Sequence, residues 1–218
     1  METHHVQLPD YTGTPSKIAR VTIKPADQAR WEVPFDHPPI EPSNDISHTS
    51  SVELTQGDNF GFRVSSYVNS DVGSVDIFKT DVGPLVFEEM FMQINTEIPE
   101  GYQIYGFGEK DQYDEQGEFG FVSGRGRKRL TIWSAGQPVK SNANLYGHQT
   151  LLLGVGPEGH SFGVFLLNSN AMEVEINDRI LTYRPIGGVF DFYFFVGDSP
   201  TEVIQQYHHL VGKARIEI

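Results

Sequence analysis

The chain of 218 residues contains no cysteine, an excess of acidic over basic residues, and no long apolar run. Without cysteine it can form no disulfide, use no thiolate in catalysis and offer no sulfur ligand to zinc. No stretch approaches the roughly 18 apolar residues of a membrane-spanning helix, so we expect no membrane span. The amino terminus has no basic region followed by an apolar core, and we therefore see no signal peptide.

The net charge of the chain limits the kinds of molecule that it can bind. There are 16 Lys and Arg residues against 29 Asp and Glu residues, which gives a formal net charge of −13. A field of this sign repels phosphate groups, so we expect no nucleic-acid partner and no anionic membrane surface. The chain is 38% hydrophobic and 12% aromatic, enough for a substantial core in one large domain, or one domain with a small neighbour.

Proline divides the chain into two regions. Seven of the thirteen prolines lie within the first 42 residues, where each removes a backbone donor and fixes φ. We therefore predict that residues 1–50 are an extended segment contributing one or two edge strands, of which Lys17–Lys24 is the clearest, and that Pro34–Ser51 is a surface connector. Residues 51–218 are predicted to form the main domain.

The main domain has the pattern of an all-β protein. Short segments rich in β-branched and aromatic residues alternate with Gly, Pro and Asn-Asp turns, which predicts a two-sheet antiparallel β-sandwich. The predicted strands are Asn59–Val68, Ser74–Thr80, Leu85–Phe87, Phe91–Ile98, Gln103–Phe107, Arg129–Trp133, Thr150–Val155, Ser161–Leu167, Ala171–Ile176, Ile180–Tyr183 and Val189–Val196.

A C-terminal α-helix is predicted over residues 199–212. Ser199-Pro-Thr-Glu202 has the form of a capping box, with proline at the first helical position. Gly212 supplies the stop signal. The apolar residues that recur at helical spacing are Val203, Ile204, Tyr207, Leu210 and Val211.

Two motifs are candidates for chemistry. In Tyr105-Gly-Phe-Gly-Glu109 the carboxylate could act as an acid or base at the mouth of a cleft; alternatively, the glycines serve close sheet packing and Glu109 pairs with a cation. His148, within Asn144–Gln149, could contact a ligand, although an ordinary hydrogen-bonded histidine is the more frequent case. A lone carboxylate or histidine is weak support for a catalytic site.

Charged segments and histidines give no sign of a cofactor. Glu109–Glu118 is acidic and Arg125–Arg129 is basic, which fits the two arms of an exposed, oppositely charged hairpin. Neither adjacent histidine pair has the i, i+4 spacing of a zinc helix, and the sequence has no nucleophile elbow or phosphate-binding glycine loop. We expect no cofactor and no metal. The residues alone predict a β-sandwich that serves as a sugar-binding or interaction module.

An ordered series of motifs resembles the N-terminal β-sandwich of the glycoside hydrolase family 31 α-glucosidases, of the maltase-glucoamylase and sucrase-isomaltase type. The resemblance covers roughly residues 87–212 and is weaker before them. The matching segments are Tyr105–Glu109, Asn144–Gln149, Ser161–Glu173, Leu181–Arg184, Gly187–Tyr193 and Val203–Tyr207.

The resemblance implies a galactose-mutarotase-like sandwich that packs against a catalytic (β/α)₈ barrel and lends it one loop. It also implies retaining hydrolysis by two carboxylates that belong to the barrel. The Trp-x-Asp-Met-Asn-Glu-like segment of the nucleophile is absent from this sequence, so we expect no catalytic residue here. Ile218 lies about where the family enters its barrel. By resemblance, we expect an extracellular location or the lumen of the secretory pathway.

The loop that the family lends to its barrel departs from the pattern. It often reads Arg-Asp-Gln-Pro, and its Asp contacts sugar hydroxyls. Here the sequence is Trp133-Ser-Ala-Gly-Gln-Pro138, which puts Gly136 in place of that Asp. A carboxylate makes strong charge-assisted hydrogen bonds that glycine cannot replace. The remaining candidates for substrate binding are Trp133, Gln137, Glu109 and His148.

Three functions stay open at this point. The chain is a non-catalytic module that contacts carbohydrate or assembles with itself or with a barrel; or it is a fragment or subunit of an active α-glucosidase; or it is an aldose-1-epimerase-like enzyme. The epimerase would need a histidine base and a carboxylate on one sugar, for which His148 and Glu109 are the candidates. A sandwich of this family has an apolar face that packs against the barrel, and without a partner that face would be exposed. Because monomers rarely expose a large apolar patch, we favour the first function.

Overall fold

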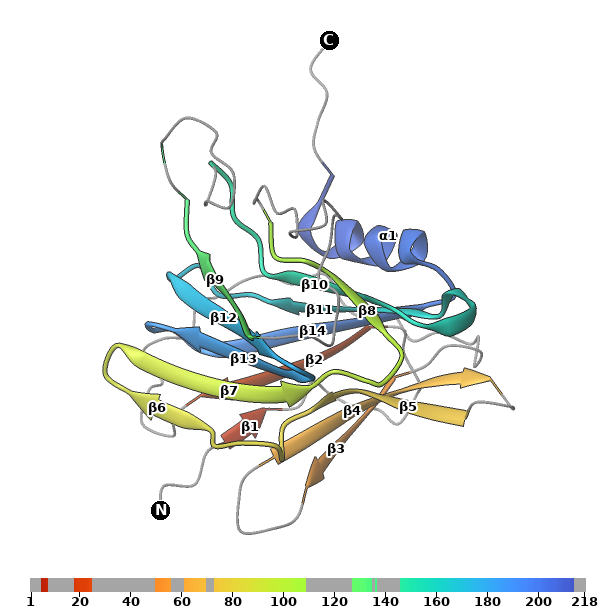
Figure 1. Ribbon diagram of the computed structural model, residues 1–218, viewed down its shortest axis with the longest axis horizontal. Coiled ribbons are helices and arrows are strands. Elements are labelled where there is room, and N and C mark those ends of the chain that lie inside the picture. Colours follow the sequence, from red (N-terminus) through yellow and green to blue (C-terminus); the bar gives the residue numbers. More distant parts are fainter. Residues whose placement is uncertain are drawn as a thin grey trace.

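The computed structural model describes residues 5–7, 18–24, 50–55, 61–69, 73–108, 127–134, 136 and 146–213. Within these ranges the strands form three antiparallel sheets, and a C-terminal helix lies over one of them (Figure 1). The predicted all-β class with a C-terminal helix is confirmed. The proposed division at residue 50 is not tested by this arrangement and stays a prediction.

The largest sheet has six strands with β14 near its middle. Its order is β1 (His5–Gln7), β2 (Ile18–Lys24), β14 (Phe190–Gly197), β11 (Ser161–Leu166), β10 (Leu151–Val155) and β8 (Gln103–Gly106). Two side chains of β2 bind Asp191 on β14. Arg20 donates to both carboxylate oxygens at 2.8 and 2.9 Å, and the hydroxyl of Thr22, the cross-strand partner of Asp191, donates to Oδ1 at 2.8 Å. The proline-rich region thus contributes a strand to the main sheet.

The second sheet has five strands and packs face to face with the first. Its order is β6 (Val86–Glu88), β7 (Phe91–Glu97), β13 (Ile180–Pro185), β12 (Met172–Asn177) and β9 (Arg127–Ile132). Inward-facing residues such as Val174 and Tyr183 are fully buried, whereas the alternate positions carry charged and polar side chains. This alternation is the period-2 pattern of a sheet with one face in the core.

A third sheet was not expected from the sequence. It consists of β3 (Ser50–Thr55), β4 (Gly61–Asn69) and β5 (Gly73–Lys79). The start of β3 overlaps the segment that we expected to be a connector, so that expectation is wrong at Ser50 and Ser51. Irregular pairing between β4 and β5 interrupts the ladder twice, and such bulges bend and twist a strand. In Figure 1 the three strands lie at the lower right.

All three sheets meet at one phenylalanine. The ring of Phe192 on β14 lies 5.5 Å from Tyr183 of the five-stranded sheet and 5.0 Å from Phe78 of the three-stranded sheet, measured between ring centroids. Phe194 adds a contact with Phe78 at 5.1 Å and with Phe62 at 6.4 Å. Because these rings are almost fully buried, they hold the sheets together as one core.

The helix α1 (Pro200–Val211) covers the outer face of the six-stranded sheet. Its Tyr207 ring lies 5.2 Å from Phe165, and Val203 is fully buried. As predicted, Ser199 accepts a hydrogen bond from the Glu202 amide. Glu202 reaches back to the amide of Asp198, one residue before the cap. Val211, the last of the apolar residues that recur at helical spacing, does not pack against the sheet and is exposed at the end of the helix.

A buried polar group joins β4 to the loops beside β8 and β11. The His160 ring lies 2.7 Å from the Tyr102 hydroxyl through Nδ1 and 3.1 Å from the Ser66 hydroxyl through Nε2. Burial raises the pKa of Tyr102 to about 12. Buried polar groups need such partners, so this trio helps to fix the three-stranded sheet. Within the described ranges no helix is long and apolar enough to cross a membrane.

Candidate functional site

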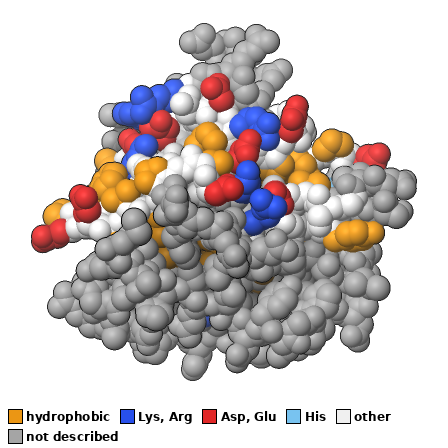
Figure 2. Space-filling view, turned by 90° about the horizontal axis from the view of Figure 1, so that it is seen from below, with side chains coloured by type: hydrophobic (Ala, Val, Ile, Leu, Met, Phe, Trp, Pro, Cys, Tyr) orange, Lys and Arg blue, Asp and Glu red, His pale blue; other side chains and the backbone are white. Residues whose placement is uncertain are grey.

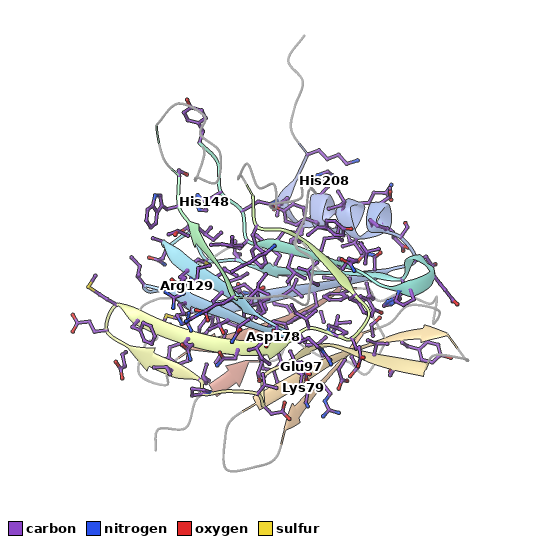
Figure 3. The ribbon with its side chains drawn as sticks, in the orientation of Figure 1. Lys79, Glu97, Arg129, His148, Asp178 and His208 are labelled. Carbon is purple, nitrogen blue, oxygen red and sulfur yellow. The ribbon has the colours of Figure 1, made fainter. Side chains whose placement is uncertain are left out.

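Two of the four predicted site residues lie in the described part of the chain. Trp133 follows β9 and is 49% exposed, and His148 precedes β10 and is also exposed. Figure 3 shows His148 beside the end of β9, away from the three-stranded sheet. Glu109 and Gln137 lie outside the described residues, so the structure does not test whether they join Trp133 and His148.

Backbone and side-chain contacts close the base of the loop between β9 and β10. The Ser134 hydroxyl lies 3.0 Å from His148 Nδ1, which ties the two ends of the loop together. The Gln149 amide donates to the Gly108 carbonyl at 2.7 Å, which joins the segment after β8 to the same place. The motifs around Tyr105–Gly108 and Tyr146–Gln149 therefore meet at one end of the sandwich.

Glycines shape this end in two ways. Gly106 has φ +114°, and a side chain there would overlap the Leu151 carbonyl, so only glycine permits this approach of β8 to β10. The close-packing interpretation of this motif is confirmed at Gly106. Gly136, in contrast, has open space around the position of a β-carbon. Nothing in the described structure therefore requires glycine at position 136.

Exposed apolar side chains form a row across the outer face of the five-stranded sheet. The Ile186 amide donates to the Ala171 carbonyl at 3.1 Å, which continues the pairing of β13 with β12 by one residue. Continuing the registers of β12 with β9 and of β13 with β7 places Trp133 beside Ala171 and Phe91 beside Ile186. Trp133, Ile186 and Phe91 are 49, 46 and 40% exposed. We call Trp133, Ala171, Ile186 and Phe91 the apolar row.

A polar network lies next to the apolar row, two residues further along each strand. Arg184 donates through Nε to Gln93 Oε1 at 2.8 Å, and through NH1 to Glu173 Oε1 at 2.7 Å and Glu175 Oε2 at 2.9 Å. Arg184 therefore spans β7, β13 and β12. Because each group holds another in place, the network is a rigid set of donors and acceptors.

Glu175 is the carboxylate that binds the arginines of this face. Arg127 binds both of its carboxylate oxygens, at 2.6 and 2.9 Å, and Arg129 adds a contact of 3.1 Å. The hydrogen bond from Arg127, followed by the one from Arg184, lowers the pKa of Glu175 to about 2, although burial opposes the shift. The basic segment of the expected hairpin thus pairs with β12, while its acidic arm lies outside the described residues. Figure 2 shows basic and acidic side chains side by side, next to hydrophobic ones.

This arrangement suits contact better than proton transfer. A general acid at neutral pH needs a raised carboxyl pKa, whereas the arginines around Glu175 lower the pKa of its carboxyl. The described residues hold no cluster of three or more His, Asp or Glu side chains able to bind a metal ion. What the site offers is aromatic surface for stacking and fixed polar groups for hydrogen bonding.

Sequence reasoning identified Trp133 and missed the rest of the apolar row and the polar network. Phe91 was predicted only as the first residue of a strand, and Ile186 lies in none of the predicted strands or turns. The signal that could have identified them is the alternation of inward and outward positions along a strand. A large apolar residue in an outward position does not fill the core and therefore indicates a contact surface. Their alignment depends on the strand order β9-β12-β13-β7, which the sequence does not reveal.

The chain is similar in sequence to several carbohydrate-active enzymes. It is 39% identical over 204 residues to intestinal sucrase-isomaltase of Suncus murinus, an alignment covering 89% of this chain and 10% of that protein. It is 35% identical over 191 residues to lysosomal alpha-glucosidase of Mus musculus, covering 87% and 19%. Alpha-xylosidase 1 of Arabidopsis thaliana is 32% identical over 215 residues, covering 89% and 22%. The chain thus spans between a tenth and about a fifth of these relatives.

Solved structures share the fold. A glycoside hydrolase family 31 dextranase from Flavobacterium johnsoniae superposes with a TM-score of 0.66 at 16% identity, over 98% of this chain and 28% of that one. A xylosidase from Aspergillus niger gives 0.58 at 15% identity, over 98% and 32%. No family model matches the sequence.

Proposed function

Because this chain is a domain of the glycoside hydrolase family 31 type, equivalent to the N-terminal β-sandwich of the α-glucosidases, we propose that it is a non-catalytic module. It acts by contact with a catalytic barrel and with carbohydrate, and it performs no chemistry of its own. Whether it works as a domain of a larger α-glucosidase or as a separate subunit, the reacting groups are supplied by other polypeptide.

The main support for the proposal is that the chain matches only a small part of the length of its relatives. The alignments cover 87–89% of this chain but 10–22% of the sucrase-isomaltase, the lysosomal alpha-glucosidase and the alpha-xylosidase. A retaining glycosidase needs two carboxyl groups about 5–5.5 Å apart, one of which has a raised pKa. Glu173 and Glu175 are neighbours on one face, but both bind Arg184, and the pKa of Glu175 is lowered.

We propose that the base of the β9–β10 loop is the part of this chain that contacts the catalytic barrel. Ser134 and His148 close it, and the exposed ring of Tyr146 stands beside it. By resemblance the family carries an acidic side chain where Gly136 lies here, so at this position the loop offers no carboxylate to the hydroxyl groups of a sugar. The names of the relatives, intestinal and lysosomal, support a place in the secretory pathway or outside the cell.

Complementation between separate chains tests the proposal. The catalytic barrel of a family relative, with its own sandwich removed, is co-expressed with this chain and purified through a tag on the chain. We expect the barrel to co-purify and to hydrolyse p-nitrophenyl α-glucoside, while the chain alone does not. Failure of the barrel to co-purify, or hydrolysis by the chain alone, would contradict the proposal.

A further inference from the structure

The geometry points to a glycan-binding surface on the outer face of the five-stranded sheet, built from the apolar row and the polar network. Among the described residues, this surface meets the β9–β10 loop only at Trp133, the residue that follows β9. Its ligand is an extended, neutral oligosaccharide that lies across the strands. The inference rests on the proposed function in one respect only, which is that the module works by contact with carbohydrate.

The first element of this surface is a pair of aromatic platforms. Trp133 stands at the β9 end of the apolar row and Phe91 at the β7 end, with Ile186 between them. Adjacent strands lie about 4.8 Å apart, so the two rings are separated by roughly 14 Å. Sugar rings have an apolar face of C–H groups, and an exposed aromatic ring is a flat apolar surface against which such a face can pack. Two platforms in line select an elongated ligand over a single sugar.

The second element is a parallel line of hydrogen-bonding groups. Gln93, Arg184 and Glu173 lie on the same face as the apolar row, two residues along their strands and therefore about 7 Å away. Their mutual contacts of 2.7 and 2.8 Å hold the amide, guanidinium and carboxylate in place. A glycan packed on the row presents its hydroxyl groups sideways, toward this line. Groups that are already ordered lose little entropy when they bind.

The exposed area favours a glycan over a second protein. An aromatic side chain has roughly 150–250 Å² of surface, so Trp133 and Phe91 each offer about 100 Å². With Ile186 and the neighbouring Met90 the apolar surface reaches about 400 Å², half of the roughly 800 Å² that a stable interface takes from each partner. The row is also only one side chain wide, which suits a single glycan chain.

Charge points to a neutral ligand. Arg184 lies between Glu173 and Glu175, and the charge of Glu175 is further balanced by Arg127. Because Arg129 also binds Glu175, three arginines face two glutamates here, and the surface next to the apolar row offers donors and acceptors that are close to charge balance. The chain as a whole carries a formal charge of −13, so a polyanionic glycan would be repelled.

Tryptophan fluorescence provides a direct readout. The chain has two tryptophans, and the substitution Trp31→Phe leaves Trp133 as the only indole. We expect maltoheptaose or cellohexaose to shift its emission to shorter wavelength and to saturate the signal, whereas glucose does so only weakly. The better of the two probes is then used in calorimetry with Trp133→Ala, Phe91→Ala and, as a matched control, Tyr67→Ala, which removes an aromatic ring of 37% exposure from β4.

We expect each of the two row variants to weaken binding by about tenfold or more and the control to leave it unchanged, with all three retaining the wild-type circular dichroism spectrum. Absence of binding to both oligosaccharides would overturn the inference, and so would unchanged affinity in Trp133→Ala and Phe91→Ala. If the row variants instead change the oligomeric state in light scattering, the row is a protein interface. None of these results depends on hydrolysis, so the inference and the proposed function can fail separately.

Discussion

Ser134 and His148 face each other across the two ends of the β9–β10 loop, with the Ser134 hydroxyl 3.0 Å from His148 Nδ1. The contact is exposed, so its energetic value is small, but it fixes where the loop leaves the sandwich. Beside it, the Gln149 amide donates to the Gly108 carbonyl. The β9–β10 loop thus emerges from a closed base rather than from two separate strand ends.

Removal of the imidazole should loosen this base without unfolding the domain. For His148→Ala we expect a loss of unfolding free energy below about 1 kcal/mol and faster hydrogen exchange at the Gln149 amide. Exchange measured by NMR at single amides checks this, with His209→Ala on the exposed face of α1 as the control. Unchanged exchange at Gln149 would show that the Ser134–His148 contact does not hold the loop.

Two glycines should respond to a side chain in opposite ways. Gly136→Asp should leave stability within about 0.5 kcal/mol of the wild type, because its β-carbon position is open. Gly154→Ala should cost about 1–3 kcal/mol, because its methyl group would overlap the ring of its cross-strand partner Phe162. Urea denaturation of both variants measures the difference. Strong destabilisation by Gly136→Asp would mean that the β9–β10 loop fills this space.

Acid should weaken the protein partly through Glu175. Its pKa of about 2 in the folded state lies below the value of roughly 4.3 for an unperturbed glutamate. The stabilisation is therefore present above the unfolded value of roughly 4.3 and is lost as the pH falls through the folded value of about 2. Urea midpoints measured between pH 2.5 and 7 should fall less steeply for Glu175→Gln than for the wild type. Glu100→Gln, at an exposed carboxylate, should keep the wild-type slope.

The three-stranded sheet should be energetically part of the core. Phe78 is nearly fully buried and contacts Phe192 and Phe194, so Phe78→Ala should cost about 3–5 kcal/mol. Tyr67→Ala, at an exposed position of the same sheet, should cost less than about 0.5 kcal/mol. Thermal unfolding should remain a single transition in both variants. A loss below 1 kcal/mol for Phe78→Ala would mean that this sheet is only loosely attached.

The local elements were predictable because each has a strong signal of its own. Val189–Val196 could only be a buried strand, and Ser199-Pro-Thr-Glu202 specified the start of the helix. The third sheet was missed because apolar and polar residues alternate only weakly in Ser50–Thr55, and because the pairing of this segment with β4 is determined by the tertiary structure. The apolar row was missed for a related reason: Phe91, Trp133 and Ile186 lie far apart in the chain, and only the strand order of the sheet brings them into line.

The account depends on the claim that this domain binds and does not hydrolyse. The most direct test is the release of glucose from maltose by the purified 24.5 kDa chain, followed over hours at high protein concentration. We predict no glucose above the rate of a buffer blank. Turnover that persists through repeated purification and disappears when one Asp or Glu of this chain is replaced would contradict the account.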